Sequence, residues 1–311
     1  MNNNNFTIIS FYQFIQLKNL NQLKIFFSGF CSFYKLRGTI LLAPEGINGT
    51  IAGLDESIQL FKKNIYSKGF NKLELKYSYH KYIPFNRLKI KIKKEIITFS
   101  RMKLDVEKNT ATYVKPKDWN SIIENKDTLV LDVRNGFENE LGTFKNSFKP
   151  QTRNFSEFKK FIDKTLSPQN HKQIAMFCTG GIRCEKASAY MLKKGFKNLY
   201  QLKGGILKYL EEIPKDQSKW QGECFVFDNR VSIKNELAIG TYQLCYGCRM
   251  PISYEDRQSN KYEKGVSCIK CFDLISGEKK KKLRERNKQI EIAKRKGIYN
   301  PYIKYTPSNF F

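Results

Sequence analysis

The chain contains only two histidines, His80 and His171, and they lie in different segments. A two-histidine, one-carboxylate iron centre would require both to converge on one metal. No glycine-rich fingerprint follows a predicted strand, so no flavin or nicotinamide site is indicated, and no haem site is evident. The sequence therefore predicts no conventional cofactor for oxygen activation or hydride transfer.

No apolar stretch reaches the ~20 residues of a membrane span, and Met1–Asn5 lacks a basic segment followed by an apolar one. Without an export signal, the eight cysteines are expected to be reduced and to serve as metal ligands or catalytic groups. We therefore expect a cytoplasmic protein that does not bind membranes. Its 311 residues are enough for two or three domains.

Acidic residues are scarce, with 29 Asp and Glu against 56 Lys and Arg, and the formal net charge is +27. A charge of this size attracts polyanions over a long range. RNA is the natural polyanion for such a protein. The composition thus supports an RNA partner, while it indicates no oligomeric state.

The segment Cys178-Thr-Gly-Gly-Ile-Arg-Cys184 reads as a complete active-site loop. An apolar run over 174–177 predicts a buried strand before it, and a helical pattern over 185–194 follows it. A cysteine at such a turn faces the free N–H groups of the helix, and the helix dipole and Arg183 both favour its thiolate. An anion-binding nest is expected from Thr179, Gly180, Gly181, Ile182 and Cys184. A structural cysteine is the alternative, but it would need neither the glycines nor the arginine.

Four cysteines near the C-terminus are spaced as Cys245-x2-Cys248-x19-Cys268-x2-Cys271. Two such pairs are typical of a structural zinc site with four thiolate ligands. In a small module the metal would replace much of the missing core. Metal-free thiols and an iron–sulfur cluster are the alternatives. A site closed by four thiolates is not expected to be catalytic.

The N-terminal segment, residues 6–99, alternates strand and helix patterns. Strands are predicted over 6–14, 39–43, 50–53 and 73–79, and helices over 17–27 and 55–69. The Asn48-Gly49 pair predicts a turn over Gly46–Gly49, and Asp55 is placed to cap the second helix. Ile58, Phe61 and Ile65 form the apolar face of that helix. This βαββαβ order predicts a ferredoxin-like, acylphosphatase-like α+β domain.

Two groups of lysines are candidates for RNA contacts. Strict alternation over Leu88–Lys93 places three apolar side chains on one face of a strand and Lys89, Lys91 and Lys93 on the other. A basic helix over 278–296 carries the second group, Lys279, Lys280, Lys281 and Lys282. A solvated strand face and a solvated helix are the plain alternatives. Aromatic residues near the end of the chain are expected to dock it on the protein: Tyr299, Tyr302, Tyr305, Phe310 and Phe311.

The Cys178 loop, with four residues between Cys178 and Arg183, resembles the active-site loop of rhodaneses, in which the cysteine carries a persulfide. Upstream, Asp132-Val133-Arg134, Glu138 and Gly142 are similar to the rhodanese Asp-x-Arg…Glu…Gly signature, although Thr143 stands where a histidine often follows. Downstream, Tyr200–Ile206 is similar to the last strand and closing glycine turn of that domain. The resemblance implies a rhodanese α/β domain with a parallel sheet over 119–219.

The flanking segments narrow the resemblance. Gly38–Thr50, the continuation Cys184-Glu-Lys-Ala-Ser-Ala189 and the cysteine-rich C-terminal part are found together in the bacterial tRNA uridine(34) hydroxylases, which the whole chain resembles. The resemblance implies three domains: 1–112, ferredoxin-like; 119–219, rhodanese; and 220–311, a cysteine-rich basic module. It implies hydroxylation of the tRNA wobble uridine, in the anticodon region, to 5-hydroxyuridine, with dioxygen as co-substrate.

The expected catalytic residues are Cys178, Arg183 and Asp132, with Asp132 and Arg134 organising the loop rather than touching substrate. The mechanistic hypothesis is that Cys178, as thiolate or persulfide, adds to C6 of the uracil and makes C5 a nucleophile toward dioxygen. Cys184 is either a resolving thiol or a small residue that packs the first helical turn. A persulfide-forming sulfurtransferase and an RNA-binding scaffold with a vestigial loop are the other function classes left open.

Overall fold

A computed structural model describes residues 6–100, 102 and 104–296. The chain forms two compact units. One comprises the residues up to Val226 together with Ile233–Ala238, and the other comprises Phe227–Ser232 and the residues from Ile239 onward. The aromatic residues predicted to dock the end of the chain lie outside the described residues.

The first part of the larger unit is an α/β sandwich with one sheet. Its elements in chain order are β1 (Phe6–Phe14), α1 (Leu20–Phe33), β2 (Arg37–Ala43), β3 (Gly46–Gly53), α2 (Asp55–Ser67), β4 (Glu74–His80) and β5 (Leu88–Ile92). The strand order is β4-β1-β3-β2-β5, antiparallel except for the β2–β5 pair. The predicted βαββαβ order is confirmed, with β5 added at one edge.

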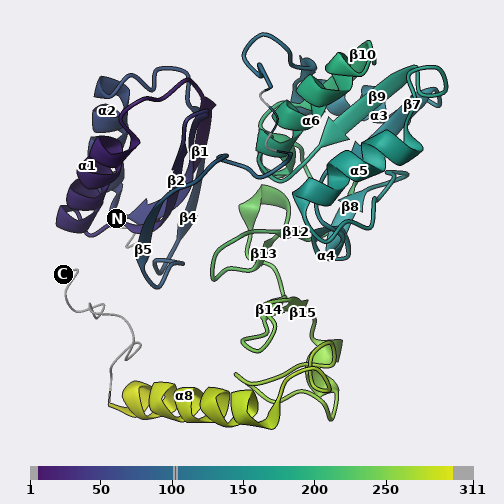
Figure 1. Cartoon of the computed structure of the whole chain (residues 1–311). Coiled ribbons are helices and arrows are strands. Elements are labelled where there is room, and N and C mark those ends of the chain that lie inside the picture. Colours follow the sequence, from purple (N-terminus) through teal and green to yellow (C-terminus); the bar gives the residue numbers. More distant parts are fainter. Residues whose placement is uncertain (1–5, 101, 103, 297–311) are drawn as a thin grey trace. The chain divides into compact units, whose positions relative to one another are not determined.

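Only one face of this sheet is covered by its own helices, α1 and α2 (Figure 1). Alternation along β1 directs Ile9 and Phe11 into that core, where they meet Phe27 and Phe61 from the helices. Ser10 and Tyr12 therefore belong to the opposite face. In the antiparallel register Ser10 lies beside Lys76 of β4, so Lys76 shares that opposite face.

Two local predictions for this part are wrong. The hairpin turns at Pro44 and Glu45, because Ala43 pairs with Gly46, and Gly46–Gly49 lies within β3. Gly49 serves close packing instead, since a Cβ there would lie 2.7 Å from the Phe11 ring. Asp55 is the first residue of α2 rather than its cap, and its carboxylate accepts a hydrogen bond from the Thr7 hydroxyl at 2.8 Å.

The second part of the larger unit is a parallel sheet with helices on both faces. Its elements are β6 (Thr112–Val114), α3 (Pro116–Glu124), β7 (Thr128–Asp132), α4 (Gly136–Asn139), β8 (Gly142–Phe144), α5 (Phe155–Thr165), β9 (Gln173–Phe177), α6 (Ile182–Lys193), β10 (Asn198–Leu202) and α7 (Gly205–Glu212). The strand order is β6-β10-β9-β7, parallel throughout. Helices α5 and α6 pack on one face, and α3 and α7 pack on the other.

Parallel strands end at one common edge of a sheet, and ligands of such folds bind there. Asp132 is the last residue of β7, and Cys178 follows β9. The fold therefore brings the Asp132-Val133-Arg134 motif and the Cys178 loop to the same edge of the sheet.

Short strands and one long helix make up the rest of the chain. The strands are β11 (Trp220–Gly222), which pairs with β8, β12 (Cys224–Phe225), β13 (Ser232–Ile233), β14 (Gln243–Leu244) and β15 (Pro251–Ile252). The helical elements are η1 (Asn235–Leu237), η2 (Glu255–Gln258) and α8 (Gly277–Arg295). No helix among the described residues is both long and apolar enough to span a bilayer.

Candidate functional site

The site is built around the Sγ atom of Cys178, at the turn from β9 into α6. Helix α6 starts at Ile182, three residues before the predicted start at Glu185, so the loop leads directly into the first helical turn. Gly181 adopts a positive φ of 98°, a conformation that favours glycine, and its N–H donates to Sγ at 3.1 Å. Cys178 is 1% exposed. The N–H of Gly181 and the backbone N–H groups of Arg183 and Cys184 are thus the donors directed at the sulfur.

Opposing effects act on the pKa of Cys178. Burial by itself raises this pKa, because it penalises the thiolate. A hydrogen bond from the Cys184 thiol, the positive charge of Arg183 and the backbone N–H groups of Cys184 and Arg183 act the other way and lower the pKa to about 6. The result is a thiolate at neutral pH, which is the reactive form of cysteine.

Arg183 is engaged by a buried carboxylate. Its two terminal nitrogens donate to the two carboxylate oxygens of Glu138 at 2.8 and 3.0 Å, and both side chains are buried. This bidentate pair fixes the guanidinium plane beside the loop. It also compensates the arginine's charge, so Arg183 is arranged to hold the loop more than to receive an anion.

Asp132 and Arg134 form a second buried pair behind the first. Arg134 donates to both carboxylate oxygens of Asp132 at 2.9 and 2.6 Å, and to the Gly142 carbonyl at 2.6 Å. Thr143 donates its hydroxyl proton to Asp132 at 2.8 Å. Asp132 is wholly buried. These contacts are those of a residue that organises the loop around Gly142.

The glycine turn before α7 closes the site from the other side. Gly205 has a φ of +67°, and a Cβ there would lie 2.5 Å from the Cys178 carbonyl oxygen and 2.8 Å from the Gly181 nitrogen. The N–H groups of Ile206 and Leu207 donate to the carbonyls of Cys178 and Thr179 at 3.0 and 3.1 Å. Only glycine permits this close approach, which directs the loop's carbonyls away from the sulfur.

The N-terminal sheet also reaches this loop. The Tyr12 hydroxyl donates to the Glu185 carboxylate at 3.0 Å, and a Cβ on Gly181 would lie 3.0 Å from the same hydroxyl oxygen. Glu185 is buried and also accepts hydrogen bonds from Thr110, Tyr113 and Gln201. Burial and the Glu185 charge raise the pKa of Tyr12 well above its usual value, so the hydroxyl stays protonated.

Lys76 of β4 lies at the same place. A Cβ on Gly180 would lie 3.9 Å from its Cε, and its Nζ lies 5.2 Å from the centroid of the Tyr12 ring. The side chain is 8% exposed. Burial lowers the pKa of Lys76, and the nearby charges of Glu74, Cys178 and Glu185 oppose that effect.

Lys186, which follows Glu185 in α6, links the two parts of the larger unit through ion pairs. Lys186 is 1% exposed, and its Nζ lies 2.6 Å from Glu95, 2.7 Å from Glu45 and 3.0 Å from the carbonyl of Ile97. Glu185 and Lys186, which belong to the motif after Cys184, thus hold the N-terminal domain against the first turn of α6.

The four C-terminal cysteines do converge. Their Sγ atoms all lie within 4.8 Å of one another, with closest separations of 3.7 Å for Cys245–Cys271 and Cys248–Cys268 and 3.8 Å for Cys268–Cys271. Zinc–sulfur bonds of about 2.3 Å in a tetrahedron place the sulfurs about 3.8 Å apart. The cluster can therefore hold a single metal ion at its centre.

The predicted lysine groups have mixed surroundings. On β5, Leu88 and Ile90 pack against the core, but Ile92 is 36% exposed, so only two of the three expected apolar side chains are covered. Lys91 and Lys93 are exposed, and Lys89 is half-buried. On α8, Lys279 donates to the Gly247 carbonyl at 3.2 Å, Lys280 lies 3.7 Å from the Phe272 ring centroid, Lys281 is exposed, and Lys282 pairs with Glu278 at 2.6 Å.

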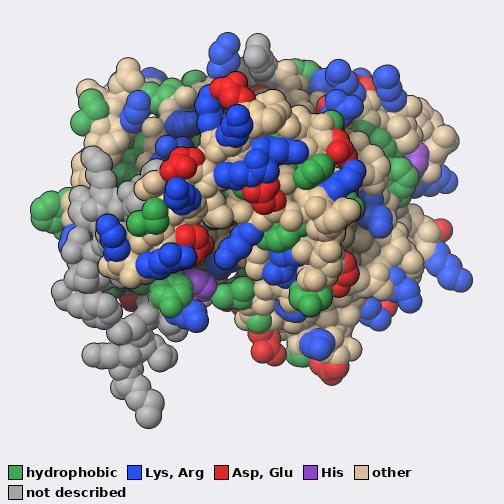
Figure 2. Space-filling model, turned by 90° about the horizontal axis from the view of Figure 1, so that it is seen from below, with side chains coloured by type: hydrophobic (Ala, Val, Ile, Leu, Met, Phe, Trp, Pro, Cys, Tyr) green, Lys and Arg blue, Asp and Glu red, His purple; other side chains and the backbone are tan. Residues whose placement is uncertain are grey.

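On the face seen in Figure 2, basic side chains are scattered rather than gathered in one block, and acidic side chains lie between them.

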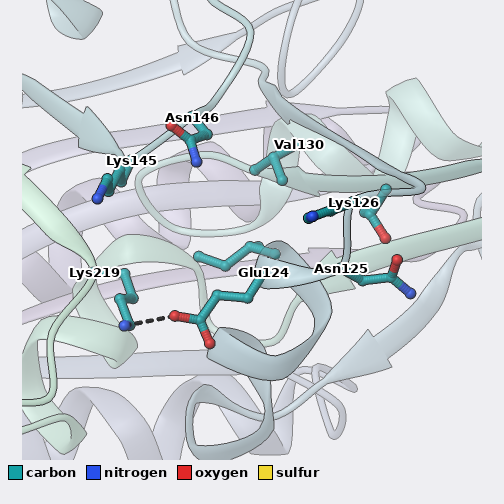
Figure 3. A pocket seen from close by; sticks show the side chains of 9 residues that line it. Glu124, Asn125, Lys126, Val130, Lys145, Asn146 and Lys219 are labelled. Carbon is teal, nitrogen blue, oxygen red and sulfur yellow. Dashed lines mark ion pairs between the residues drawn. The ribbon is translucent and has the colours of Figure 1, made fainter.

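A cavity of about 410 Å³ lies next to α3, and Lys219 and Glu124 form an ion pair at its wall (Figure 3). Thr128, the first residue of β7, also lines it. This cavity is therefore at the amino end of the strands and has no part in the Cys178 site.

Neither histidine belongs to the group of potential metal ligands found among the described residues. His80 bonds the Tyr82 carbonyl at 2.7 Å, and His171 bonds the Ser167 carbonyl at 3.2 Å. Each therefore has a partner close to it in sequence, in its own part of the fold.

The sequence interpretation missed Tyr12, Lys76 and the pairing of Arg183 with Glu138. Tyr12 and Lys76 lie on the sheet face that α1 and α2 leave uncovered, and a polar strand face is read from sequence as solvent-exposed. Their one signal was alternation in β1 and β4, which separates the two faces but does not say what covers the second.

Comparisons with known proteins cover the whole architecture. Residues 6–96 match the family described as a UPF0176 acylphosphatase like domain, and residues 115–212 match the rhodanese-like domain. A tRNA uridine(34) hydroxylase from Teredinibacter turnerae is 47% identical over 293 residues, covering 94% of this chain and 91% of the relative.

Solved structures match part of the chain. A rhodanese-related protein from Thermoplasma volcanium is 29% identical, covering 32% of this chain and 92% of that one, with a TM-score of 0.27. A protein of unknown function and possible tyrosine phosphatase from Rhodopseudomonas palustris is 23% identical, covering 34% and 83%, with a TM-score of 0.29.

Proposed function

This chain belongs to the tRNA uridine(34) hydroxylase family, and on that premise we propose that it hydroxylates the wobble uridine of tRNA to 5-hydroxyuridine, with dioxygen as co-substrate. The observation that carries the proposal is the Cys178 nest, where the pKa of the thiol is lowered to about 6 inside a loop contacted by both domains. We propose that the enzyme is cytoplasmic and acts on the anticodon region of the tRNA.

The chemistry follows from a thiolate in a ring of N–H donors. The Cys178 sulfur adds to C6 of the uracil, and the electron pair of the C5–C6 double bond moves toward C5 and O4. C5 then bonds to dioxygen to give a peroxide anion, and cleavage of the O–O bond to the hydroxyl and water takes three protons and two electrons, the electrons from an external dithiol that leaves as its disulfide. Loss of the C5 proton and departure of the sulfur restore the double bond. Arg183 and Asp132 position the loop for these steps.

Nucleoside mass spectrometry of wobble uridines in cells lacking the protein tests this function. Wild-type protein should restore 5-hydroxyuridine derivatives in air but not without oxygen, and Cys178→Ala should restore none. Equal restoration by both forms would show that the loop is not the catalyst. A tRNA with 5-fluorouridine at the wobble position should trap a covalent Cys178 adduct; product on normal tRNA without any adduct would refute the addition step.

We also propose zinc as the metal of the C-terminal cluster, since the sulfur separations match a tetrahedral four-thiolate site. Its role is structural, because four protein ligands leave no open position. An iron–sulfur cluster fits less well, because several irons would spread the sulfurs further apart than one ion does.

The domain boundaries that we propose with this function are 1–112, 119–219 and 220–311.

The RNA contacts are proposed for Lys89, Lys91 and Lys93 on β5 and for Lys279, Lys280, Lys281 and Lys282 on α8. All of these lysines except Lys89 and Lys280 are exposed, and Lys279 and Lys282 also contact the Gly247 carbonyl and Glu278. Charge removal at such positions weakens binding uniformly and reduces its salt dependence.

A sulfurtransferase is the second candidate, favoured by the rhodanese-like match over 115–212 and the Cys178 thiolate. Transfer of sulfur from thiosulfate to cyanide, together with unchanged wobble uridines in the deletion strain, would favour the sulfurtransferase function. The Glu185 and Lys186 contacts argue for hydroxylation, because sulfur transfer alone needs no N-terminal domain at the loop.

A further inference from the structure

We infer that Lys76, supplied by the N-terminal domain, is a further catalytic residue, whose ammonium group binds the uracil oxygen that becomes negative when Cys178 adds to the ring. The inference rests on the proposed function for the identity of the substrate. Its geometric part, a lysine facing the Cys178 thiolate, stands without that function.

The position of Lys76 is the first argument. The residue lies in the middle of β4, on the sheet face that also carries Tyr12, and its side chain extends along the Tyr12 ring to Gly180. Gly180 is two residues from Cys178. Tyr12 is in turn held by its hydrogen bond to Glu185, so the aromatic ring supports the lysine from a fixed position.

The second argument is that Lys76 lacks an ion-pair or hydrogen-bond partner for its ammonium group. Within the part of the chain that the structure describes, Lys76 forms no ion pair and donates no side-chain hydrogen bond, although it is 8% exposed. Burying an ammonium group without an anion costs several kcal/mol. The charged groups around it are Glu74 on its own strand, Glu185 on α6, Lys208 on α7 and the thiolate of Cys178.

The third argument is that Arg183 is already committed. Both of its terminal nitrogens bind Glu138, and Lys186 is shared between Glu45 and Glu95. Lys76 is thus the buried cation at the loop that is available for an incoming anion. An ammonium group beside the site of developing charge stabilises the transition state more than the ground state.

An RNA phosphate is a less suitable partner for this lysine. A backbone phosphate stays hydrated at the surface, where exposed lysines such as Lys91 and Lys93 can meet it. A buried lysine needs an anion that enters the site, and the reacting base supplies one.

Three variants test the inference: Lys76→Met, Lys76→Arg and the exposed control Lys72→Met. We would measure single-turnover formation of 5-hydroxyuridine at saturating tRNA, tRNA affinity, and the pKa of Cys178 from thiolate ultraviolet absorbance with Cys178→Ser as blank. Lys76→Met should slow hydroxylation by about 10²- to 10³-fold, as the loss of one oxyanion donor does. It should also raise the pKa of Cys178 and leave tRNA affinity close to the wild-type value.

Lys76→Arg keeps the charge and should hold the pKa of Cys178 near the wild-type value, and Lys72→Met should change nothing. Methionine removes the buried charge, so an unfolding midpoint equal to or above that of the wild-type protein shows that the variant is folded. Wild-type rates in Lys76→Met, or a loss seen only in tRNA affinity, would overturn the inference. If wild-type protein itself forms no product, the proposed function fails. In that case an unchanged pKa of Cys178 in Lys76→Met would also overturn the geometric part.

Discussion

At the scale of single residues, Arg183 could have been expected both to stabilise the Cys178 thiolate and to bind an incoming anion. The site separates these two tasks. Glu138 compensates Arg183, so the arginine lowers the pKa of Cys178 and holds the loop but has both terminal nitrogens occupied. The Cys184 thiol contributes a hydrogen bond to the same sulfur. Burial alone would have made Cys178 inert, and the surrounding donors reverse that effect.

The first residue-scale prediction concerns the protonation of Cys178. Thiolate absorbance assigned to Cys178 should appear as pH rises through about 6, because the folded-state pKa lies below that of an ordinary thiol. Cys184→Ala removes the thiol donor and should move this midpoint to higher pH. A titration of Cys178 near pH 9 in wild-type protein would contradict the nest description.

The second concerns the buried pair of Glu138 and Arg183. Glu138→Gln removes the carboxylate charge from the buried pair with Arg183 and should lower the free energy of unfolding by about 3–5 kcal/mol. Glu140→Gln, on an exposed neighbour, is the control and should stay within about 0.5 kcal/mol. Chemical unfolding measures both variants, and equal small effects would show that the pair is not the anchor of the loop.

At the scale of elements, helix α6 serves both domains. Its first turn presents N–H groups to Cys178, and the same turn carries Glu185 and Lys186, which bind the N-terminal sheet and the segment after β5. The helix end beside Cys178 and the residues of the domain contact therefore belong to one element, α6. A displacement of the N-terminal domain would change the position of the helix end that stabilises the thiolate.

Lys186→Met tests this coupling. Loss of the cation leaves the buried Glu95 carboxylate without the Lys186 charge, and stability should fall by about 3–5 kcal/mol. Lys194→Met near the other end of the helix removes a half-exposed pair with Asp163 and should cost no more than about 1 kcal/mol. Urea unfolding compares the two, and similar losses would argue against a docking role for Lys186.

At the scale of the whole molecule, the two compact units differ in how they are stabilised. The larger unit has extensive apolar cores on both of its sheets. The core of the smaller unit consists of Ile252, Ile275 and the cysteines themselves, with few partly buried neighbours. With so small an apolar core, the proposed metal is expected to be the main source of order for the smaller unit.

Removal of the metal should therefore act on one unit only. A zinc chelator, or Cys248→Ser, should abolish the calorimetric transition of the smaller unit and leave that of the larger unit in place. Metal analysis before and after dialysis gives the stoichiometry. A folded smaller unit without any bound metal would contradict the structural role, and the transition of the larger unit is the internal control.

Much of this protein was determined by the sequence alone. Strand and helix periods predicted the βαββαβ order, and two Cys-x2-Cys pairs predicted the cluster at Cys245, because each of these signals is a short pattern within the sequence. The Cys178 nest was also local, since a strand, two glycines and a helix suffice to define it. Errors arose where two local signals competed, as in the Asn48-Gly49 pair, whose glycine serves packing against Phe11.

Only the tertiary structure decided what faces the reactive sulfur. Tyr12 and Glu185 are 173 residues apart in sequence, and Lys76 comes from a strand whose alternation gave no sign of a partner. Periodicity divides a strand into two faces, but an exposed face and a face that docks on another domain carry similar side chains. The second face of the N-terminal sheet gained its function from docking, which depends on shape and charge across the whole domain and not on any local pattern.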